Sequence, residues 1–534
     1  MHPPVANLPK PWLRPALIGL TILLAAVLLF ARLGHDAFWD DEAATALGAK
    51  AILRTGKNTA FVGGGNLVAY RSGAALHGFD NRIEPLLPPY LTAASFVVFG
   101  MNTWAARLPF ALFGLGTVAL LLWWARRERW QTVAVLGFAL LGSVPFFLYA
   151  RNCRYYAAAT FFSVALVFLY RRGRPTVANA FAFAGLASLL FLSNSLNYAA
   201  LCGCLGLDYL LWQRRESPLG WRLLCCAFLP QMVVVGLVMA FWNPLQTPHG
   251  GNLAHNTLGE RLTMFWWEWR DTNVCEQLCL PLLLVALGVG VARRRPLLVR
   301  GCVALVVYFA AMAALSPQLL SELHKADVRY LAPVIPLAVG LEVATLCVLL
   351  GRWTLPLLGA AVVVFGTNLA NGGFLFDPEV HSTLASYVQE LADPPDEPYG
   401  PVAAWINAHV PAGKTILVGP RYAAYPLMFY APKAVYAWQF DDARPEYAML
   451  PPIHFVGRVA PDYLVTYGPY LDQVSDAVDQ THFPGVSYEH VATINVYWQA
   501  MDRPELFWHS FGQVDGFDPD SEAVQIFQRT DVPR

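Results

Sequence analysis

Charged residues are scarce in this sequence. Asp, Glu, Lys and Arg make up 14% of the 534 residues, whereas soluble globular domains contain about 25%. Apolar residues reach 56% of the chain. This composition excludes an ordinary soluble domain and predicts an integral membrane protein. The formal net charge is zero, so bulk electrostatics give no argument for a nucleic-acid partner.

Cysteine motifs that would mark a metal or redox site are also missing. The nine cysteines include no CxxC pair and no zinc-type spacing. Cys275 and Cys279 lie about one helical turn apart, which is poor geometry for a disulfide. The chain contains no Asn-x-Ser/Thr acceptor for glycosylation, which favours a bacterial protein over one of the secretory pathway.

Long apolar runs fill the first two thirds of the chain. About eleven of them approach the ~20 residues that a helix needs to cross a bilayer. The first run has no small-residue cleavage site before Asp36, which predicts a retained anchor instead of a signal peptide. We therefore expect a polytopic α-helical membrane protein with about eleven transmembrane helices. The predicted spans are 12–31, 104–125, 130–150, 155–170, 175–193, 196–212, 221–242, 276–292, 296–315, 330–350 and 353–371.

Arginine clusters fall in alternate short loops between these spans. The positive-inside rule places such loops, and with them the N-terminal residues 1–11, in the cytoplasm. A segment at 86–99 cannot then cross the membrane, because a crossing would invert every later loop. Its flanking prolines predict a re-entrant or interfacial helix. The clusters are Arg126, Arg127 and Arg129; Arg171, Arg172 and Arg174; Arg214 and Arg215; and Arg293, Arg294 and Arg295.

This orientation divides the chain into two parts. Residues 12–371 form the predicted membrane domain, with a first outer loop at 33–103. Residues 372–534 form a predicted extracytoplasmic α/β domain, because their patterns are those of soluble elements. The clearest patterns are a helix at 401–409 and strands at 415–418, 462–466 and 523–527.

Three consecutive carboxylates, Asp40, Asp41 and Glu42, follow the first span on its outer side. Carboxylates this close raise one another's pKa, so one of them could serve as a general base. The alternative is a solvated helix start, where acidic side chains are stabilised by the helix dipole. The run alone does not decide between the two.

Other short motifs recur in an order typical of one superfamily. The chain resembles the GT-C glycosyltransferases, which use lipid-linked sugars and include the protein O-mannosyltransferases and bacterial aminoarabinose transferases. The resemblance covers about residues 12–336. Its motifs are Asp41-Glu42 after the first span, Glu84-Pro85-Leu86-Leu87-Pro88-Pro89-Tyr90, Phe99-Gly100, Ala106-Arg107-Leu108-Pro109, Phe113-Gly114, the loop from Arg151 to Tyr155, and Arg329-Tyr330-Leu331-Ala332-Pro333.

The resemblance implies transfer of a sugar from a polyprenyl-phosphate donor to a lipid, glycan or protein acceptor. The active site would face the outside of a membrane, such as the periplasmic side of a bacterial cytoplasmic membrane. Asp41 is then the expected base, with Glu42 orienting it or contacting the acceptor. Asp40 is an extra acid that leaves the base ambiguous. Glu84 is a second candidate, or else a cap or partner of Arg82.

A polyprenyl phosphate that leaves carries developing negative charge, which requires fixed cations at the membrane boundary. Arginine offers bidentate phosphate contacts and lysine a point charge. The alternative for each residue is a snorkelling interfacial side chain. The candidates for donor and phosphate binding are Arg151, Arg154, Tyr155, Lys325, Arg329 and Tyr330.

A metal site is not assigned. His249 and His255 lie six residues apart in an outer loop and could help to bind a divalent cation, but no carboxylate in this stretch stands at ligand spacing. Divalent-metal dependence therefore stays open. Asp208 and Glu342 lie inside spans, where we interpret them as interhelical hydrogen-bonding groups. The run from Arg503 to His509 is distinctive, but no mechanism follows from it.

Two other classes of function remain as alternatives. An O-antigen-type ligase or polymerase would use a lipid-diphosphate donor at a similar outer site. A non-enzymatic transporter or flippase would show repeated halves and charges at mid-membrane, of which the sequence has few. A nucleotide-sugar enzyme is disfavoured, because none of the predicted inner loops is long enough for a cytoplasmic catalytic domain.

Overall fold

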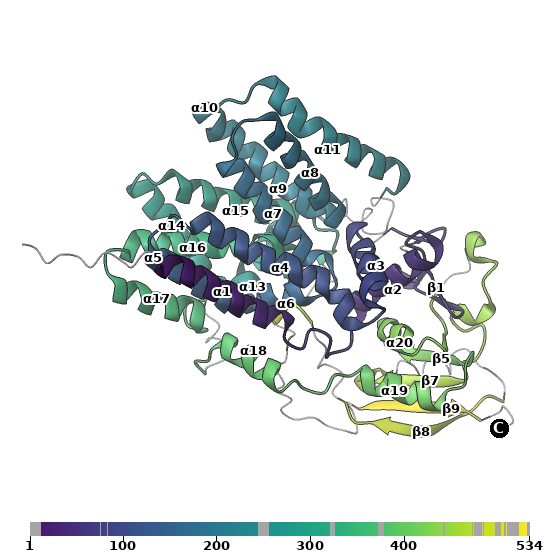
Figure 1. The fold of residues 1–534 in the computed structure, drawn as a ribbon. Coiled ribbons are helices and arrows are strands. Elements are labelled where there is room, and N and C mark those ends of the chain that lie inside the picture. The colour runs from purple at the N-terminus through teal and green to yellow at the C-terminus, as the bar shows by residue number, and fades with distance from the viewer. Residues whose placement is uncertain are drawn as a thin grey trace, which may run out of the picture.

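The computed structural model describes most of the chain. The described residues are 12–74, 76–82, 84–243, 256–320, 326–371, 379–441, 444–472, 474, 483, 485–496, 503–506, 509 and 523–530. They form a large helical part and a smaller part built around a sheet, which lie against one another (Figure 1).

Every predicted span coincides with a helix or with a consecutive pair of helical segments. Long apolar sequences form helices in a membrane because helices satisfy all of their backbone hydrogen bonds internally. The segments are α1 (Leu13–Phe30), α4 (Thr103–Ala125), α5 (Trp130–Gly142), α6 (Val144–Arg151), α7 (Tyr155–Arg172), α8 (Val177–Ser193), α9 (Ser195–Asp208), the π-helical η2 (Tyr209–Gln213), α11 (Trp221–Phe241), α14 (Leu280–Ala292), α15 (Pro296–Leu315), the 3-10 helix η5 (Val328–Val334), α16 (Ile335–Leu350) and α17 (Thr354–Gly366).

Length and composition qualify five described helical stretches as membrane spans, namely α1, α4, α11, α15 and Val328–Leu350. The pair α5 and α6 is a sixth candidate, although it is bent by 58°. Helix α6 begins at Val144-Pro145. Because proline has no backbone N–H, Pro145 cannot donate a hydrogen bond that would continue helix α5. These apolar helices are those of an integral membrane protein. The number of about eleven crossings stays a prediction.

The first outer loop folds into helices and short hairpins. Helix α2 (Asp40–Thr55) begins at the acidic run, and α3 (Leu87–Phe99) has only 13 residues. A straight helix of that length is too short to cross hydrocarbon, which needs ~20 residues. Helix α3 packs against both α2 and α4. Two hairpins lie between α2 and α3: β1 (Phe61–Gly63) with β2 (Asn66–Leu67), and β3 (Leu76–His77) with β4 (Asp80–Asn81).

The C-terminal part contains a five-stranded sheet in the order β6-β5-β7-β9-β8. Strand β5 runs parallel to β6 and β7, whereas β9 is antiparallel to β7 and β8. The predicted helix at 401–409 and the three predicted strands are confirmed. The bounds are α18 (Thr383–Ala392), α19 (Gly400–His409), β5 (Thr415–Gly419), α20 (Ala424–Tyr430), β6 (Val435–Tyr436), β7 (Tyr463–Tyr467), β8 (Tyr488–Ile494) and β9 (Val524–Arg529).

Helix α20 packs between the sheet part and α2 (Figure 1). Phe38 packs edge-on against Phe429 with 4.9 Å between ring centroids, and its amide donates to the Tyr430 hydroxyl at 3.1 Å. Lys50 donates to the Phe429 carbonyl at 3.0 Å. Helix α2 and the residues just before it are therefore attached to the C-terminal part.

Candidate functional site

The acidic run occupies the first turn of α2, where the exposed amides of the helix favour negative charge. Successive residues of a helix point about 100° apart, so the three carboxylates reach different surroundings. Glu42 is fully buried and Asp41 is 5% exposed, while Asp40 is half-buried. The three acids therefore do not share one role.

Asp41 lies between two arginines. Its Oδ2 accepts from Arg329 Nη1 at 2.9 Å and lies 3.3 Å from Arg154 Nη2. Arg154 is the residue just before α7, and Arg329 lies in η5. The structure thus brings together three predicted site residues from distant parts of the chain. An Asp carboxylate with two guanidiniums is a strongly charged centre at the ends of apolar helices.

Glu84 belongs to the same cluster through Arg154. Its Oε1 lies 2.5 Å from Arg154 Nη1, and its Oε2 accepts from the Thr45 hydroxyl at 3.3 Å. Burial raises the pKa of Glu84, and the charge of Arg154 opposes that rise. The side chain is 3% exposed, so Arg154 is clamped between the carboxylates of Glu84 and Asp41.

Glu42 has a different environment. Its two oxygens accept from Arg107 Nε at 3.0 Å and Nη2 at 2.6 Å, and the Cys153 amide donates to Oε1 at 2.6 Å. Glu42 and Arg107 are both 0% exposed. This buried pair joins α2 to α4 and to the loop between α6 and α7. Glu42 is therefore placed to hold the site together. The sequence signal for this role of Arg107 is its place as an arginine within an apolar helix.

Asp40 is the third acid. Its Oδ1 is buried and accepts no hydrogen bond from any residue that the structure describes. Burial, followed by the charge of Asp41, raises the pKa of Asp40 to about 7, although Arg503 and Arg329 oppose the rise. A carboxyl group that titrates near neutrality can exchange protons under ordinary conditions.

Arg151 lies away from this cluster, at the end of α1. Its Nη1 donates to the carbonyls of Leu28, Leu29 and Ala31 at 3.1, 3.2 and 2.7 Å. The last carbonyls of a helix have no partner within the helix, and they carry partial negative charge. The geometry of Arg151 is thus that of a helix C-terminal cap.

The two predicted tyrosines lie face to face. The rings of Tyr155 and Tyr330 are stacked at 19° with 6.3 Å between centroids, beside Arg154 and Arg329. Lys325, His249 and His255 lie outside the described residues. Within those residues there is no group of three His, Cys, Asp or Glu side chains that could hold a metal ion.

Three charged residues join the cluster without having been predicted. Asp327 binds Arg329 through both oxygens, at 2.7 Å from Nε and 3.0 Å from Nη2. Glu505 Oε1 lies 3.1 Å from the same Nε. The Arg503 charge acts on Asp40. The position of Asp327, two residues before Arg329, was a signal in the sequence. Glu505 and Arg503 lie in the C-terminal part, and their sequence positions do not connect them with Arg329.

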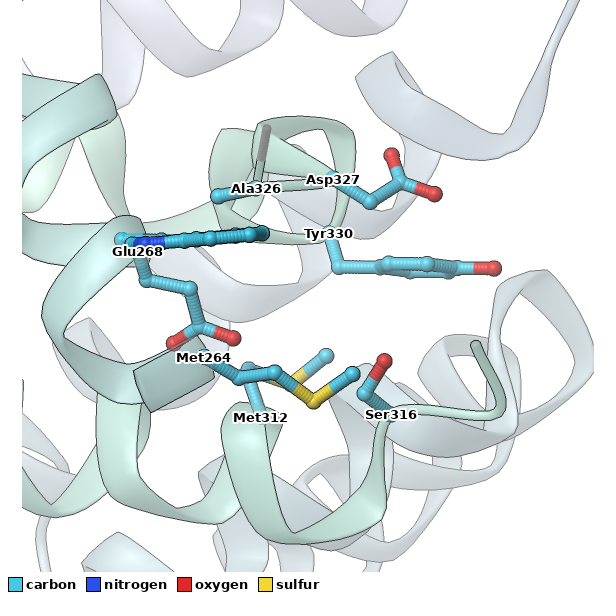
Figure 2. A pocket seen from close by; sticks show the side chains of 8 residues that line it. Met264, Glu268, Met312, Ser316, Ala326, Asp327 and Tyr330 are labelled. Carbon is cyan, nitrogen blue, oxygen red and sulfur yellow. The ribbon is translucent and has the colours of Figure 1, made fainter. Parts of the chain in front are cut away.

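A small cavity of about 10 Å³ lies beside Tyr330, enough for about one water molecule. The ring of Tyr330 and the carboxylate of Glu268 border this space (Figure 2). Glu268 belongs to α13 (Leu258–Val274), and burial raises its pKa well above the usual range. Met264, Trp267, Met312, Ser316, Ala326 and Asp327 complete the lining.

Comparisons with known proteins identify the fold. No family model and no curated protein matches the sequence. The structure is similar to that of ArnT from Cupriavidus metallidurans bound to undecaprenyl phosphate, with a TM-score of 0.55, 16% identity, and coverage of 96% of this chain and 97% of that one. The apo form of the same protein gives a TM-score of 0.54 and 17% identity over 90% and 95% of the two chains. The chain therefore has the fold of the GT-C glycosyltransferases, as its sequence motifs predicted.

Proposed function

We propose that this protein is a membrane glycosyltransferase that moves a sugar from a polyprenyl-phosphate donor to a lipid, glycan or protein acceptor on the outer face of the membrane. The observation that carries the proposal is the position of Asp41 between Arg154 and Arg329. These groups meet at the ends of apolar helices, within a fold that is similar to that of ArnT, which was solved bound to undecaprenyl phosphate.

The reaction makes two demands that this cluster can meet. The donor's phosphate gains negative charge as the sugar leaves, and preorganised cations lower the energy of that charge. Arg329 is the more accessible cation, since its side chain is 26% exposed while that of Arg154 is 9% exposed. We therefore assign Arg329 to the phosphate and Arg154 to the positioning of Asp41 and Glu84.

The second demand is a base for the acceptor, whose hydroxyl or amine must lose a proton as it attacks the anomeric carbon. We assign this role to Asp41. Two guanidiniums stabilise the Asp41 carboxylate and thereby weaken it as a base. When the donor's phosphate takes a share of Arg329, the basicity of Asp41 rises at the moment when a base is needed. Asp40 is the second candidate, because its pKa of about 7 suits proton transfer near neutral pH.

The stacked rings of Tyr155 and Tyr330 lie next to both arginines. Aromatic faces pack on sugar rings and on the first units of a lipid chain, and tyrosine is common at the membrane boundary. We assign these two rings to contacts with the donor. Lys325 remains a sequence prediction for phosphate binding.

The test is sugar release from a panel of polyprenyl-phosphate sugars by detergent-purified protein, with candidate acceptors present. Asp41→Asn keeps the size of the side chain and removes the base. We expect wild type to release sugar and the variant to lose at least ~100-fold in rate, the scale of general-base catalysis. Asp36→Asn is the matched control, because it makes the same change in the same outer loop and Asp36 pairs with His35 instead of with the cluster.

Two outcomes would contradict the proposal. Consumption of lipid-diphosphate glycans, with no consumption of any monophosphate donor, would indicate the ligase or polymerase class. An Asp41→Asn variant that releases sugar at the wild-type rate would refute the assignment of the base, and Asp40→Asn would then be the variant to compare.

A further inference from the structure

The C-terminal segment that begins at Arg503 inserts a carboxylate into the proposed donor site. Glu505 is 8% exposed, and its Oε1 lies 3.1 Å from Arg329 Nε. Its Oε2 is buried and accepts no hydrogen bond from the part of the chain that the structure describes. Glu505 thus binds the guanidinium that we assign to the donor's phosphate.

This carboxylate has unfavourable neighbours. Burial raises the pKa of Glu505, and the nearby Asp327 carboxylate raises it further. The charges of Arg329 and Arg503 oppose these effects, as does a backbone hydrogen bond to the carboxylate. The Glu505 carboxylate is therefore held at a place where two cations attract it and Asp327 repels it.

Arg503 is the second arginine near the Glu505 carboxylate. Its guanidinium lies 5.7 Å from the centroid of the Trp39 ring, within cation–π range. Trp39 is fixed in turn, since its indole nitrogen donates to Asn152 Oδ1 at 2.5 Å. Arg503 lowers the pKa of both Asp40 and Glu505. Two arginines, one from the membrane part and one from the C-terminal part, therefore act on the same carboxylate.

We propose that Arg329 and Arg503 form an anion site for the phosphate of the lipid donor, and that Glu505 occupies this site until the donor binds. A phosphate offers more acceptor oxygens than a carboxylate and matches the fork of arginine. It can therefore displace a glutamate that is also repelled by Asp327. The identity of the ligand as the donor's phosphate rests on the proposed function.

The competing explanation is that Glu505 only fastens the C-terminal segment to the membrane part. The same segment has a second attachment, where His509 Nε2 lies 2.8 Å from Glu390 Oε2 and Nδ1 lies 2.9 Å from the Arg503 carbonyl. Glu390 belongs to α18. Loss of either carboxylate would loosen the segment, but only loss of Glu505 would remove one of the carboxylates that bind Arg329. The two glutamates therefore make a matched pair for a test.

The experiment measures equilibrium binding of radiolabelled undecaprenyl phosphate to the full-length protein in detergent. We expect Glu505→Gln to bind about tenfold more tightly than wild type and Arg503→Gln about tenfold more weakly, the change produced by one charge-assisted contact. Glu390→Gln should stay within about twofold of wild type. Undecaprenol, which lacks the phosphate, should bind all four proteins alike.

Unchanged or weaker binding by Glu505→Gln would overturn the inference, and so would equal tightening by Glu390→Gln. Glu505→Ala removes the same charge and replaces the Gln variant if that variant unfolds. The proposed function fails separately. If wild type consumes no polyprenyl-phosphate sugar but the binding constants shift as expected, the anion site stands and the reaction is another one. If sugar is released but binding is unaffected, only this inference is wrong.

Discussion

The buried pair of Glu42 and Arg107 gives the sharpest test of whether the three acids of the acidic run have different roles. Arg107→Met keeps most of the apolar volume of the side chain and removes the charge. Glu42 would then retain the Cys153 amide as a donor, but would lose two hydrogen bonds of 3.0 and 2.6 Å from the guanidinium. Its carboxylate would remain fully buried.

The expected cost follows from that burial. Removal of one partner of a buried ion pair destabilises proteins by about 3–5 kcal/mol, because the other charge stays uncompensated. Glu42→Gln should cost less than Arg107→Met, since a neutral amide is left in place of a charge. The double variant Glu42→Leu/Arg107→Met should recover most of the loss, because apolar residues of similar volume often replace such pairs without cost.

The assay is unfolding in mixed micelles by titration with a denaturing detergent, combined with a double-mutant cycle. Glu216→Gln is the control, because Glu216 pairs with Arg300 but its side chain is 53% exposed, and an exposed pair contributes only about 0–1 kcal/mol. Wild-type stability of Arg107→Met would refute the reasoning. So would a Glu42→Gln variant that keeps its stability but loses sugar release at least ~100-fold, since Glu42 would then be catalytic.

Two further predictions concern Asp40 and Arg151. Because the pKa of Asp40 is raised to about 7 in the folded protein, its carboxyl binds more protons folded than unfolded between about pH 4 and 7, and stability falls as the pH rises through that range. The thermal stability of Asp40→Asn, relative to that of wild type, should therefore be higher at about pH 8 than at about pH 5. Melting curves that show the same relative stability at both pH values would contradict the raised pKa of Asp40. Arg151→Gln should lower stability by about 1–3 kcal/mol through loss of the α1 cap but leave binding of undecaprenyl phosphate unchanged; binding as weak as that of Arg329→Gln would place Arg151 in the donor site.

The helices were predictable because hydrocarbon leaves the backbone few choices. All predicted spans coincide with helices, and α15 has the predicted bounds. The bend between α5 and α6 was missed, because an uninterrupted apolar run conceals a break at a proline. The number of crossings does not follow from helix length alone, since several of these helices are shorter than the ~20 residues that a straight span needs.

The sequence predicted those residues of the site that belong to the recurring motifs. Asp41, Arg154 and Arg329 were found, and they meet. Arg151 and Arg154 are three residues apart and look equivalent in the sequence, but the turn between α6 and α7 points one toward α1 and the other toward α2. Spacing cannot distinguish such a pair. Glu505 could not be placed at all, because its contact with Arg329 depends on how the C-terminal part packs.

The charges of the cluster are unbalanced, and this has a consequence for donor binding. Its described members are the carboxylates Asp40, Asp41, Glu84, Asp327 and Glu505 and the guanidiniums Arg154, Arg329 and Arg503. With every group ionised, the acids would outnumber the bases by two, which would repel an anionic donor. Burial raises the pKa of Asp40, Glu84 and Glu505, so protons on these acids can restore the balance. A phosphate that enters the cluster brings further negative charge and raises their proton affinity again. We therefore expect donor binding to take up protons and to weaken as the pH rises.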